Sequence, residues 1–312
     1  MIKADQLTRQ FGSFCAVDRL SFEVSPGEVL GFLGPNGAGK STTMKMITGF
    51  LQPTSGSVSI FGHDIERQPI QAKSMIGYLP EGAPAYGDMT VLAFLRFIGE
   101  IRGFSGAELK RRVARVVAQL DLKDVVAQPI HTLSKGYKRR VGLAQTLIHD
   151  PRILILDEPT DGLDPNQKQQ VRELIQNLSD DKIVIVSTHI LEEVTSVCSR
   201  AMIIANGQKV IDGTPAELEA RSRYHQAISL RFQQPVTEAA GRFAALKGVV
   251  EVDEQQQGLS YLLFPDKNAQ LYPAVSALIE QQGWQLDSLH IERGRLDDVF
   301  RSLTQADATA QV

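Results

Sequence analysis

A glycine-rich loop with one lysine and one serine is the first segment whose composition predicts chemistry. Residues 34–41 read Gly-Pro-Asn-Gly-Ala-Gly-Lys-Ser and fit the phosphate-binding pattern G-x-x-x-x-G-K-[ST]. Glycines let the backbone point its N–H groups at phosphate oxygens, and a following helix adds its N-terminal dipole. We expect Lys40 to reach the outer phosphates and Ser41 to ligate Mg²⁺. The alternative, a turn that binds nothing, is disfavoured by the strand before the loop and the helix after it.

Two acids form the second candidate site. The apolar run Ile153–Leu156 ends in Asp157 and Glu158, and α/β proteins bind ligands at the carboxyl ends of their strands. We expect Asp157 to hold Mg²⁺, directly or through water. Strand alternation puts Glu158 on the opposite face, where it would polarise water for attack on the γ-phosphate. An acidic helix cap is the alternative, and the nearby phosphate loop disfavours it.

Both motifs need strands and helices that bring them together. The apolar run Val29–Leu33 is a predicted buried strand before the loop, and a helix is expected from Lys40 onward. Apolar runs at Ile153–Leu156 and Ile183–Ser187 are typical of central parallel strands. Helices are predicted at Thr90–Arg102, Gly106–Leu120 and Tyr137–His149. Strands that alternate with helices in this way indicate an α/β layer fold.

The pattern changes after about residue 222. Strands and helices are predicted there in the order β-α-β-β-α-β, which is typical of a ferredoxin-like α+β domain. They cover His225–Phe232, Thr237–Leu246, Val249–Asp253, Leu259–Phe264, Ala269–Gln282 and Leu286–Ile291. The sequence therefore predicts two domains, 1–221 and 222–312. The second could buttress or regulate a dimer, or sense a ligand, and no catalytic set is predicted within it.

Composition narrows the class of protein. The 312 residues are 43% hydrophobic and 22% charged, which excludes a mainly disordered, collagen-like or coiled-coil chain. The net charge is −3, so no overall basic field favours nucleic acid, and no nucleic-acid partner is expected. No run of 18 apolar residues occurs, and the chain is not expected to cross a membrane alone.

Further motifs between and after these two carry a family resemblance. They are the Leu-Ser-Lys-Gly-Tyr segment at 133–137, Asp-Gly-Leu-Asp at 161–164, and Ser-Thr-His at 187–189. An aromatic residue, Phe11, precedes all of these motifs in the chain. Together with the phosphate loop and the two acids, their order and spacing over about residues 2–220 resemble those of ABC-transporter ATPases. A phosphate loop alone would also fit kinases and small GTPases.

The resemblance implies roles for individual residues. It implies an ABC-type ATPase domain, a mixed sheet with a helical subdomain, that binds ATP and Mg²⁺ in a head-to-tail homodimer. His189 would contact the γ-phosphate and orient water with Glu158, although a lone histidine is more often an ordinary polar residue. Phe11 would stack on adenine, although alone it is more often a core residue. Lys40 completes the catalytic set. Contacts to ATP are expected from Phe11, Gly34, Pro35, Asn36, Gly37, Ala38, Gly39, Lys40, Ser41, Thr42, Glu81, Ser134, Gly136 and Asp164.

Three positions depart from the family pattern. Lys135 and Tyr137 replace a glycine and a glutamine, whereas Ser134 and Gly136, which would meet the second subunit's phosphate, are retained. Glu81 stands where the family has a glutamine after a strand, which adds a negative charge and removes an amide donor. Glu81 is a candidate Mg²⁺ ligand together with Ser41 and Asp157.

The same features resemble one exporter branch of the family, which includes gliding-motility, drug, antibiotic-resistance and polysaccharide export ATPases. The segment Leu296–Phe300 resembles a C-terminal segment common there. The resemblance implies an ATP-hydrolysing subunit at the cytoplasmic face of the inner membrane, coupled to a separate permease that docks near Glu81–Arg102. The alternative is a soluble ABC ATPase in DNA repair or translation. Such proteins usually carry long coiled coils or two cassettes, which this chain lacks.

Overall fold

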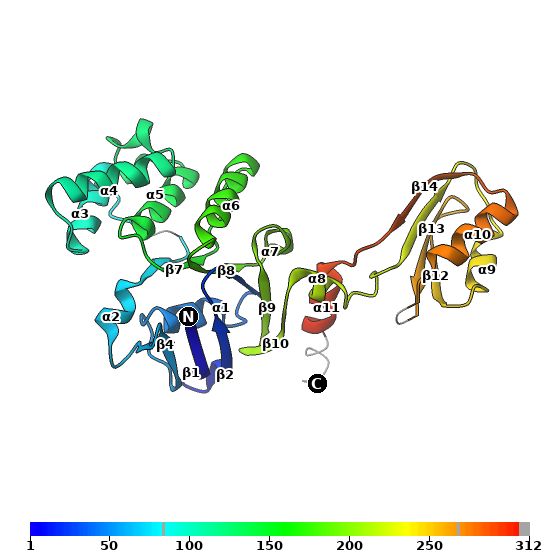
Figure 1. Cartoon of the computed structure of the whole chain (residues 1–312), viewed down its shortest axis with the longest axis horizontal. Coiled ribbons are helices and arrows are strands. Elements are labelled where there is room, and N and C mark those ends of the chain that lie inside the picture. Colours follow the sequence, from blue (N-terminus) through cyan, green and yellow to red (C-terminus); the bar gives the residue numbers. More distant parts are fainter. Residues whose placement is uncertain (83–84, 267–268, 306–312) are drawn as a thin grey trace. The chain divides into compact units, whose positions relative to one another are not determined.

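The computed structural model describes residues 1–82, 85–266 and 269–305 (Figure 1). The chain divides into two compact units, Met1–Thr214 and Pro215–Val312. The sequence placed the boundary between residues 221 and 222. The difference is helix α8 (Pro215–Glu219), which packs against α11 (Leu296–Gln305) and so belongs to the second unit.

The described residues of the first unit form two sheets. One is antiparallel, with strand order β2-β1-β4-β5, and the other is six-stranded, with order β10-β9-β3-β8-β7-β6. The strands are β1 (Ile2–Phe11), β2 (Phe14–Val24), β3 (Val29–Leu33), β4 (Ser55–Ile60), β5 (His63–Asp64), β6 (Ile76–Leu79), β7 (Ile153–Asp157), β8 (Ile183–Thr188), β9 (Arg200–Ala205) and β10 (Gln208–Gly213).

The central sheet aligns the strand ends that carry the motifs. Strands β9, β3, β8, β7 and β6 pair in parallel, and only β10 joins antiparallel. In the register, Leu33 lies opposite Thr188, and Asp157 lies opposite Ser187. The phosphate loop, the two acids and His189 therefore leave adjacent strands at the same edge of the sheet.

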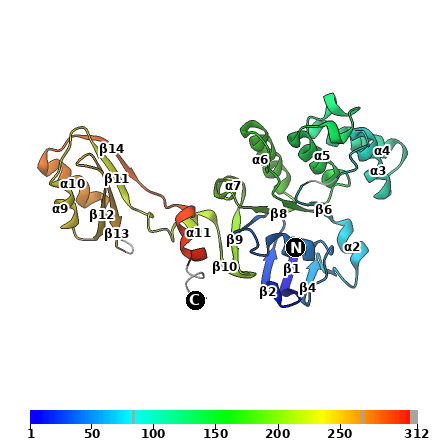
Figure 2. The same cartoon turned by 180° about the vertical axis from the view of Figure 1, so that it is seen from behind.

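The helices of the first unit start where the sequence provides caps. They are α1 (Lys40–Ile47), α2 (Pro69–Ser74), α3 (Val91–Ile101), α4 (Gly106–Gln119), α5 (Lys135–Leu147), α6 (Pro165–Ser179) and α7 (Leu191–Val197). The side chains of Thr90, Ser134 and Asp164 accept N-cap hydrogen bonds at the starts of α3, α5 and α6. Helices α3, α4 and α5 contact one another and form the helical part of the unit (Figure 2).

One hydrophobic core holds the two sheets together. Side chains from β1, β2 and β4 meet those of β3, β7 and β8, with α1 between them. Leu7, Phe32, Met44, Ile60 and Ile155 are among its buried members. Burial of this apolar surface is the main stabilising contribution, and it fixes α1 beneath the phosphate loop.

The second unit has its own antiparallel sheet and core. Its elements after α8 are β11 (Ile228–Phe232), α9 (Ala239–Ala244), β12 (Val249–Gln256), β13 (Ser260–Pro265), α10 (Tyr272–Gln282), β14 (Leu286–Ile291) and α11. The strand order is β12-β13-β11-β14. Phe232, Phe243, Tyr261 and Trp284 form an aromatic cluster in its core. The element order β-α-β-β-α-β agrees with the sequence pattern.

Candidate nucleotide site

A cavity of about 380 Å³ lies at the carboxyl edge of the central sheet. It gathers most of the residues that the sequence predicted for ATP. Its lining is Phe11, Phe14, Ala16, Asn36, Gly37, Ala38, Gly39, Lys40, Ser41, Thr42, Glu81, Glu158 and His189. Five stretches of the chain thus line one cavity, which includes the phosphate loop and the charged side chains of Lys40, Glu81 and Glu158.

The loop before α1 holds its lysine inside the turn. Lys40 Nζ donates to the carbonyl oxygens of Gly34 (2.7 Å) and Pro35 (3.1 Å). Gly39 has φ 103°, which an L side chain rarely adopts, and a Cβ at Gly34 would lie 2.3 Å from Ile204 O. Burial lowers the pKa of Lys40, while Glu158, Asp157 and Glu81 oppose that shift. The loop thus positions a cation where phosphates would enter.

Asp157 does not itself line the cavity, but it bonds to Ser41, which does, in an arrangement that suits a divalent cation. Ser41 Oγ donates to its Oδ1 (3.3 Å), and Ser187 Oγ also donates to Oδ1. Its other oxygen, Oδ2, is buried and has no hydrogen-bond partner among the described residues. A buried carboxylate oxygen costs free energy unless something pairs with it. Oxygen ligands are those that Mg²⁺ prefers, so Ser41 and Asp157 fit the predicted site.

Glu158 and His189 form the candidate catalytic pair. His189 Nδ1 lies 2.9 Å from Glu158 Oε1. Glu158 follows β7 and has φ 49°, a left-handed conformation uncommon for a non-glycine residue. This turn, rather than the simple alternation of a strand, sets the direction of its side chain. Such strained backbone is often found at functional sites.

Two aromatic residues flank the cavity at the β1–β2 hairpin. Phe11 and Phe14 are cross-strand partners and are 47% and 59% exposed. Arg9 packs over the Phe11 ring, 4.6 Å from its centroid. An exposed aromatic ring at a polar cavity can stack on a base. The sequence analysis did not predict Phe14 as a site residue, because only the register of the β1–β2 hairpin places it beside Phe11.

Comparison with known proteins identifies the family. The sequence model of the family "ABC transporter" matches residues 17–161. The linearmycin resistance ATP-binding protein LnrL of Bacillus subtilis is 36% identical over 222 residues, which is 71% of each chain. Nod factor export ATP-binding protein I of Paraburkholderia xenovorans is 36% identical over 75% of this chain and 78% of its own.

The chain belongs to the ABC transporter ATP-binding proteins. The "Probable multidrug ABC transporter ATP-binding protein YbhF" of Escherichia coli is 38% identical over 71% of this chain, but that match spans only 38% of its own length. A solved ATP-binding subunit of an ABC transporter shares 28% identity with a TM-score of 0.66, over 71% of this chain and 92% of that one. CbiO1 from Clostridium perfringens, described as part of the complex cbiONQ, shares 27% with a TM-score of 0.63, over 70% and 90%. The ABC ATPase fold expected from the sequence is confirmed.

The signature serine and glycine of this ABC protein lie outside the cavity described above, as does Asp164. Ser134 Oγ caps α5 by accepting from Tyr137 N (3.3 Å), and Asp164 Oδ1 caps α6 by accepting from Gln167 N (2.9 Å). A Cβ at Gly136 would lie 2.3 Å from Gln167 Oε1. The starts of α5 and α6 therefore approach each other closely, with Ser134 and Asp164 exposed and Gly136 buried against Gln167.

Buried polar residues of β8 and α7 support the ABC site, and the sequence analysis did not assign them this role. Ser187 Oγ accepts from Glu158 N (3.1 Å) while it donates to Asp157. Glu193 accepts from Thr160 Oγ1 and from Thr188 Oγ1, the second at 2.7 Å. The one available signal was the presence of polar residues at the end of an apolar strand.

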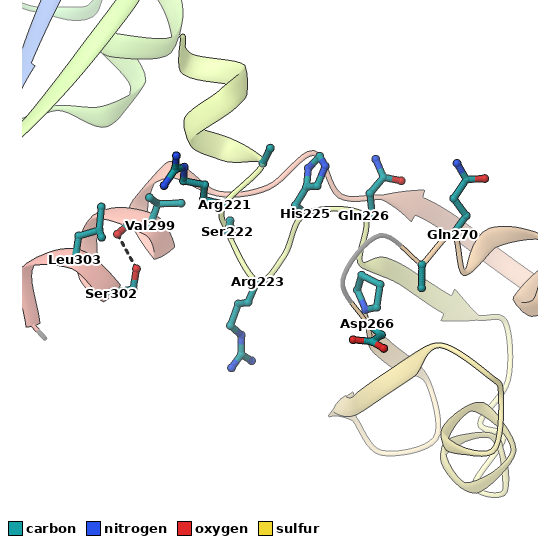
Figure 3. Close-up of a pocket in the computed structure, with 13 residues that line it drawn as sticks. Arg221, Ser222, Arg223, His225, Gln226, Asp266, Gln270, Val299, Ser302 and Leu303 are labelled. Atoms are coloured by element: carbon teal, nitrogen blue, oxygen red, sulfur yellow. Dashed lines mark hydrogen bonds between the residues drawn. The ribbon is translucent and has the colours of Figure 1, made fainter. Parts of the chain in front are cut away.

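The second unit contains a larger cavity, of about 910 Å³, in which the polar side chains do not converge on one point (Figure 3). Its lining comes from residues 220–226, from the loop after β13 and from α11. Figure 3 shows the labelled polar side chains spread along it rather than directed at one point, with Ser302 bonded to Val299 O (2.8 Å). The smaller nucleotide cavity therefore remains the candidate active site. No helix in the described parts of either unit combines the length and apolar character that a membrane crossing requires.

Proposed function

We propose that this chain is the ATP-binding and ATP-hydrolysing subunit of a membrane exporter. The observation that carries the proposal is the Glu158–His189 contact of 2.9 Å beside the phosphate loop in one cavity. Glu158 would accept a proton from water as the water attacks the γ-phosphate, and His189 would hold Glu158 in place and contact the phosphate. Lys40 and the loop N–H groups would bind the phosphates. Mg²⁺, when bound, supplies positive charge that offsets the phosphate charge.

The substitution Glu158→Gln tests the chemical step. It removes the base but keeps the size of the side chain, so kcat for ATP should fall about 100-fold or more. ATP affinity should change little, because the phosphate loop is intact. Phosphate release and equilibrium nucleotide binding measure the two effects. Unchanged turnover in Glu158→Gln would sink the assignment of the base.

We also propose that two copies enclose two ATP molecules head to tail. The support is that Ser134 and Gly136 lie outside the cavity of their own chain, at the start of a helix whose N–H groups favour anions. A second subunit's phosphates would satisfy this surface. In the Glu158→Gln background ATP should produce a dimer in light scattering, and Ser134→Arg should abolish it. A dimer that persists in Ser134→Arg would contradict this arrangement.

A permease partner is supported by an exposed aromatic group after β6. Tyr86 is 61% exposed, and its ring meets Phe97 and Phe94 edge-on at 5.6 and 6.2 Å. Ile101 at the end of α3 is also exposed. These residues fall in the expected docking segment Glu81–Arg102, of which residues 83 and 84 lie outside the described residues. The chain would then act at the cytoplasmic face of the inner membrane, attached through its permease.

The substitution Tyr86→Ala tests the docking surface. It should reduce co-purification of the chain with membranes while ATP turnover of the isolated protein is retained. Tyr272→Ala is the matched control, because Tyr272 is a similarly exposed tyrosine in the second unit. Equal membrane association of both variants would contradict the docking surface.

The relatives' names, multidrug, linearmycin resistance and Nod factor export, support an exported organic cargo for this chain as well.

A further inference from the structure

Arg139 is a buried cation that contacts the backbone on both sides of the candidate base. It lies in α5 and is 5% exposed. Its Nε donates to Pro159 O (3.2 Å), and one terminal nitrogen donates to the carbonyls of Asp157 and Glu158. The other terminal nitrogen lies 3.4 Å from Pro80 O. Its hydrogen-bond acceptors in the described parts of the chain are therefore carbonyls at the ends of β6 and β7.

These contacts explain how an unfavourable turn is held. Glu158 is in the left-handed region at φ 49°, which is unfavourable for a non-glycine residue. The turn makes successive carbonyls converge, and a planar guanidinium can donate to several acceptors at fixed angles. On the other side of the turn, Glu158 N donates to Ser187. Arg139 from helix α5 and Ser187 from strand β8 thus hold the peptides on either side of Glu158.

The surroundings of Arg139 are strongly acidic. Burial lowers the pKa of Arg139, and the charges of Asp161, Asp157, Glu158 and Glu81 oppose that shift. Glu81 follows Pro80, whose carbonyl is one of the acceptors. A buried cation needs nearby negative charge, and clustered carboxylates need nearby positive charge. Arg139 can therefore offset the charge that Glu81 adds to this edge of the sheet.

We propose that Arg139 is a positioning residue for Glu158, which holds the left-handed turn after β7 and balances the charge of Glu81. This inference rests on the proposed ATPase function. It also gives the signature helix a direct connection to the base, since Ser134 caps the helix that carries Arg139. A movement of α5 would then shift Arg139 and, through its hydrogen bond, the backbone of Glu158.

Arg139→Gln tests the positioning role, with Arg140→Gln as the matched control. Arg140 is 8% exposed on the same helix, but it contacts Leu120 O, Gln170 and Asp121. In Arg139→Gln, kcat should fall about 10- to 100-fold with little change in KM, because the base is displaced while the phosphate loop is intact. Amide hydrogen exchange at Glu158 and Asp161, measured without nucleotide, should be faster. Arg140→Gln should change neither quantity. Arg139→Lys, which keeps the charge but loses the planar donors, should fall between Arg139→Gln and the wild type.

Glu81→Gln tests the charge balance. If Arg139 offsets Glu81, the Arg139→Gln/Glu81→Gln double variant should have a higher kcat than Arg139→Gln, and a double-mutant cycle should show coupling. Additive effects would overturn the charge balance. Equal exchange rates in wild type and Arg139→Gln, or equal effects of Arg139→Gln and Arg140→Gln, would overturn the positioning role. A wild-type protein without ATP turnover would contradict the proposed function instead, and the exchange measurement would still decide the role of Arg139.

Discussion

The hydroxyl of Ser187 connects Asp157, the last residue of β7, and Glu158, which follows it, to the neighbouring strand β8. It is fully buried, donates to Asp157 and accepts from Glu158 N. Ser187→Ala removes this group and leaves a buried carboxylate oxygen with fewer donors, so the free energy of unfolding should fall by about 1–3 kcal/mol. Urea denaturation without nucleotide measures it. Ser179→Ala, which removes an exposed hydroxyl bonded to Gln176 O, is the control and should cost less than about 0.5 kcal/mol.

Much of the residue-level site was predictable, because a phosphate loop dictates its own local geometry. The cavity contains the predicted Lys40, Glu158 and His189. The support around them was not predictable from spacing. Ser187, Glu193 and Arg139 come from other elements and act through buried hydrogen bonds. Apart from the place of Ser187 at the end of an apolar strand, their local sequence does not separate them from ordinary polar residues. Whether the predicted contacts to ATP form stays a prediction.

At the scale of elements, the phosphate loop packs too closely on β9 to accept a side chain. A Cβ at Gly34 would lie 2.3 Å from Ile204 O and 3.1 Å from Ala38 Cβ. Since a backbone oxygen cannot move aside cheaply, Gly34→Ala should lower the free energy of unfolding by about 1–3 kcal/mol. Gly241→Ala is the control, because nothing lies within 4 Å of its Cβ in α9. Gly241→Ala should stabilise by about 0.5–1 kcal/mol, and equal midpoints in both variants would contradict the close contact.

The end of α5 is tied to β6 by a neutral histidine. His149 Nε2 lies 3.0 Å from Ile76 O, and burial, followed by the charge of Arg102, lowers the pKa of His149 to about 4. The unfolded chain takes up this proton near pH 6.5 and the folded chain only near pH 4, so acid favours the unfolded state in that window. The free energy of unfolding should therefore fall by up to about 1.4 kcal/mol per pH unit as pH drops from about 6.5 to about 4.

His149→Gln isolates this contribution, because glutamine can keep a donor for Ile76 O but does not titrate. The stability difference, wild type minus His149→Gln, should decrease as the pH falls from about 6.5 to about 4. Denaturant titrations at several pH values measure this difference, which cancels the contribution of other acids. A difference that stays constant with pH would show that His149 is not held neutral by the fold.

Element boundaries were predicted well where one period dominates the sequence. Val29–Leu33 is a strand as predicted. No end of α3 or α4 differs from its predicted position by more than one residue. Strand order was not predictable. That β6 and β7 pair in parallel although more than 70 residues separate them depends on long-range packing that no local pattern encodes.

At the scale of the whole molecule, the two units have separate cores. The core that joins the two sheets of the first unit runs from Ile2 to Ile204, and the aromatic cluster of the second lies between Ile228 and Trp284. A unit with its own core can fold alone. Composition showed only an ordinary globular chain, and the shift to β-α-β-β-α-β was the signal for a second unit. The second compact unit begins at Pro215, seven residues before the predicted boundary, because the short helix α8 packs against α11.

Removal of the second unit tests what it contributes. The fragment Met1–Thr214 retains every residue that lines the nucleotide cavity. It should therefore fold and bind ATP with the affinity of the full chain. If the second unit buttresses the dimer, the fragment carrying Glu158→Gln should dimerise with ATP less tightly than the full chain with the same substitution, by about tenfold or 1.4 kcal/mol. Sedimentation over a concentration series measures both constants. Equal dimerisation of the two Glu158→Gln proteins, with equal ATP turnover of the fragment and the full chain that keep Glu158, would exclude a buttressing role and leave ligand sensing as the function to test.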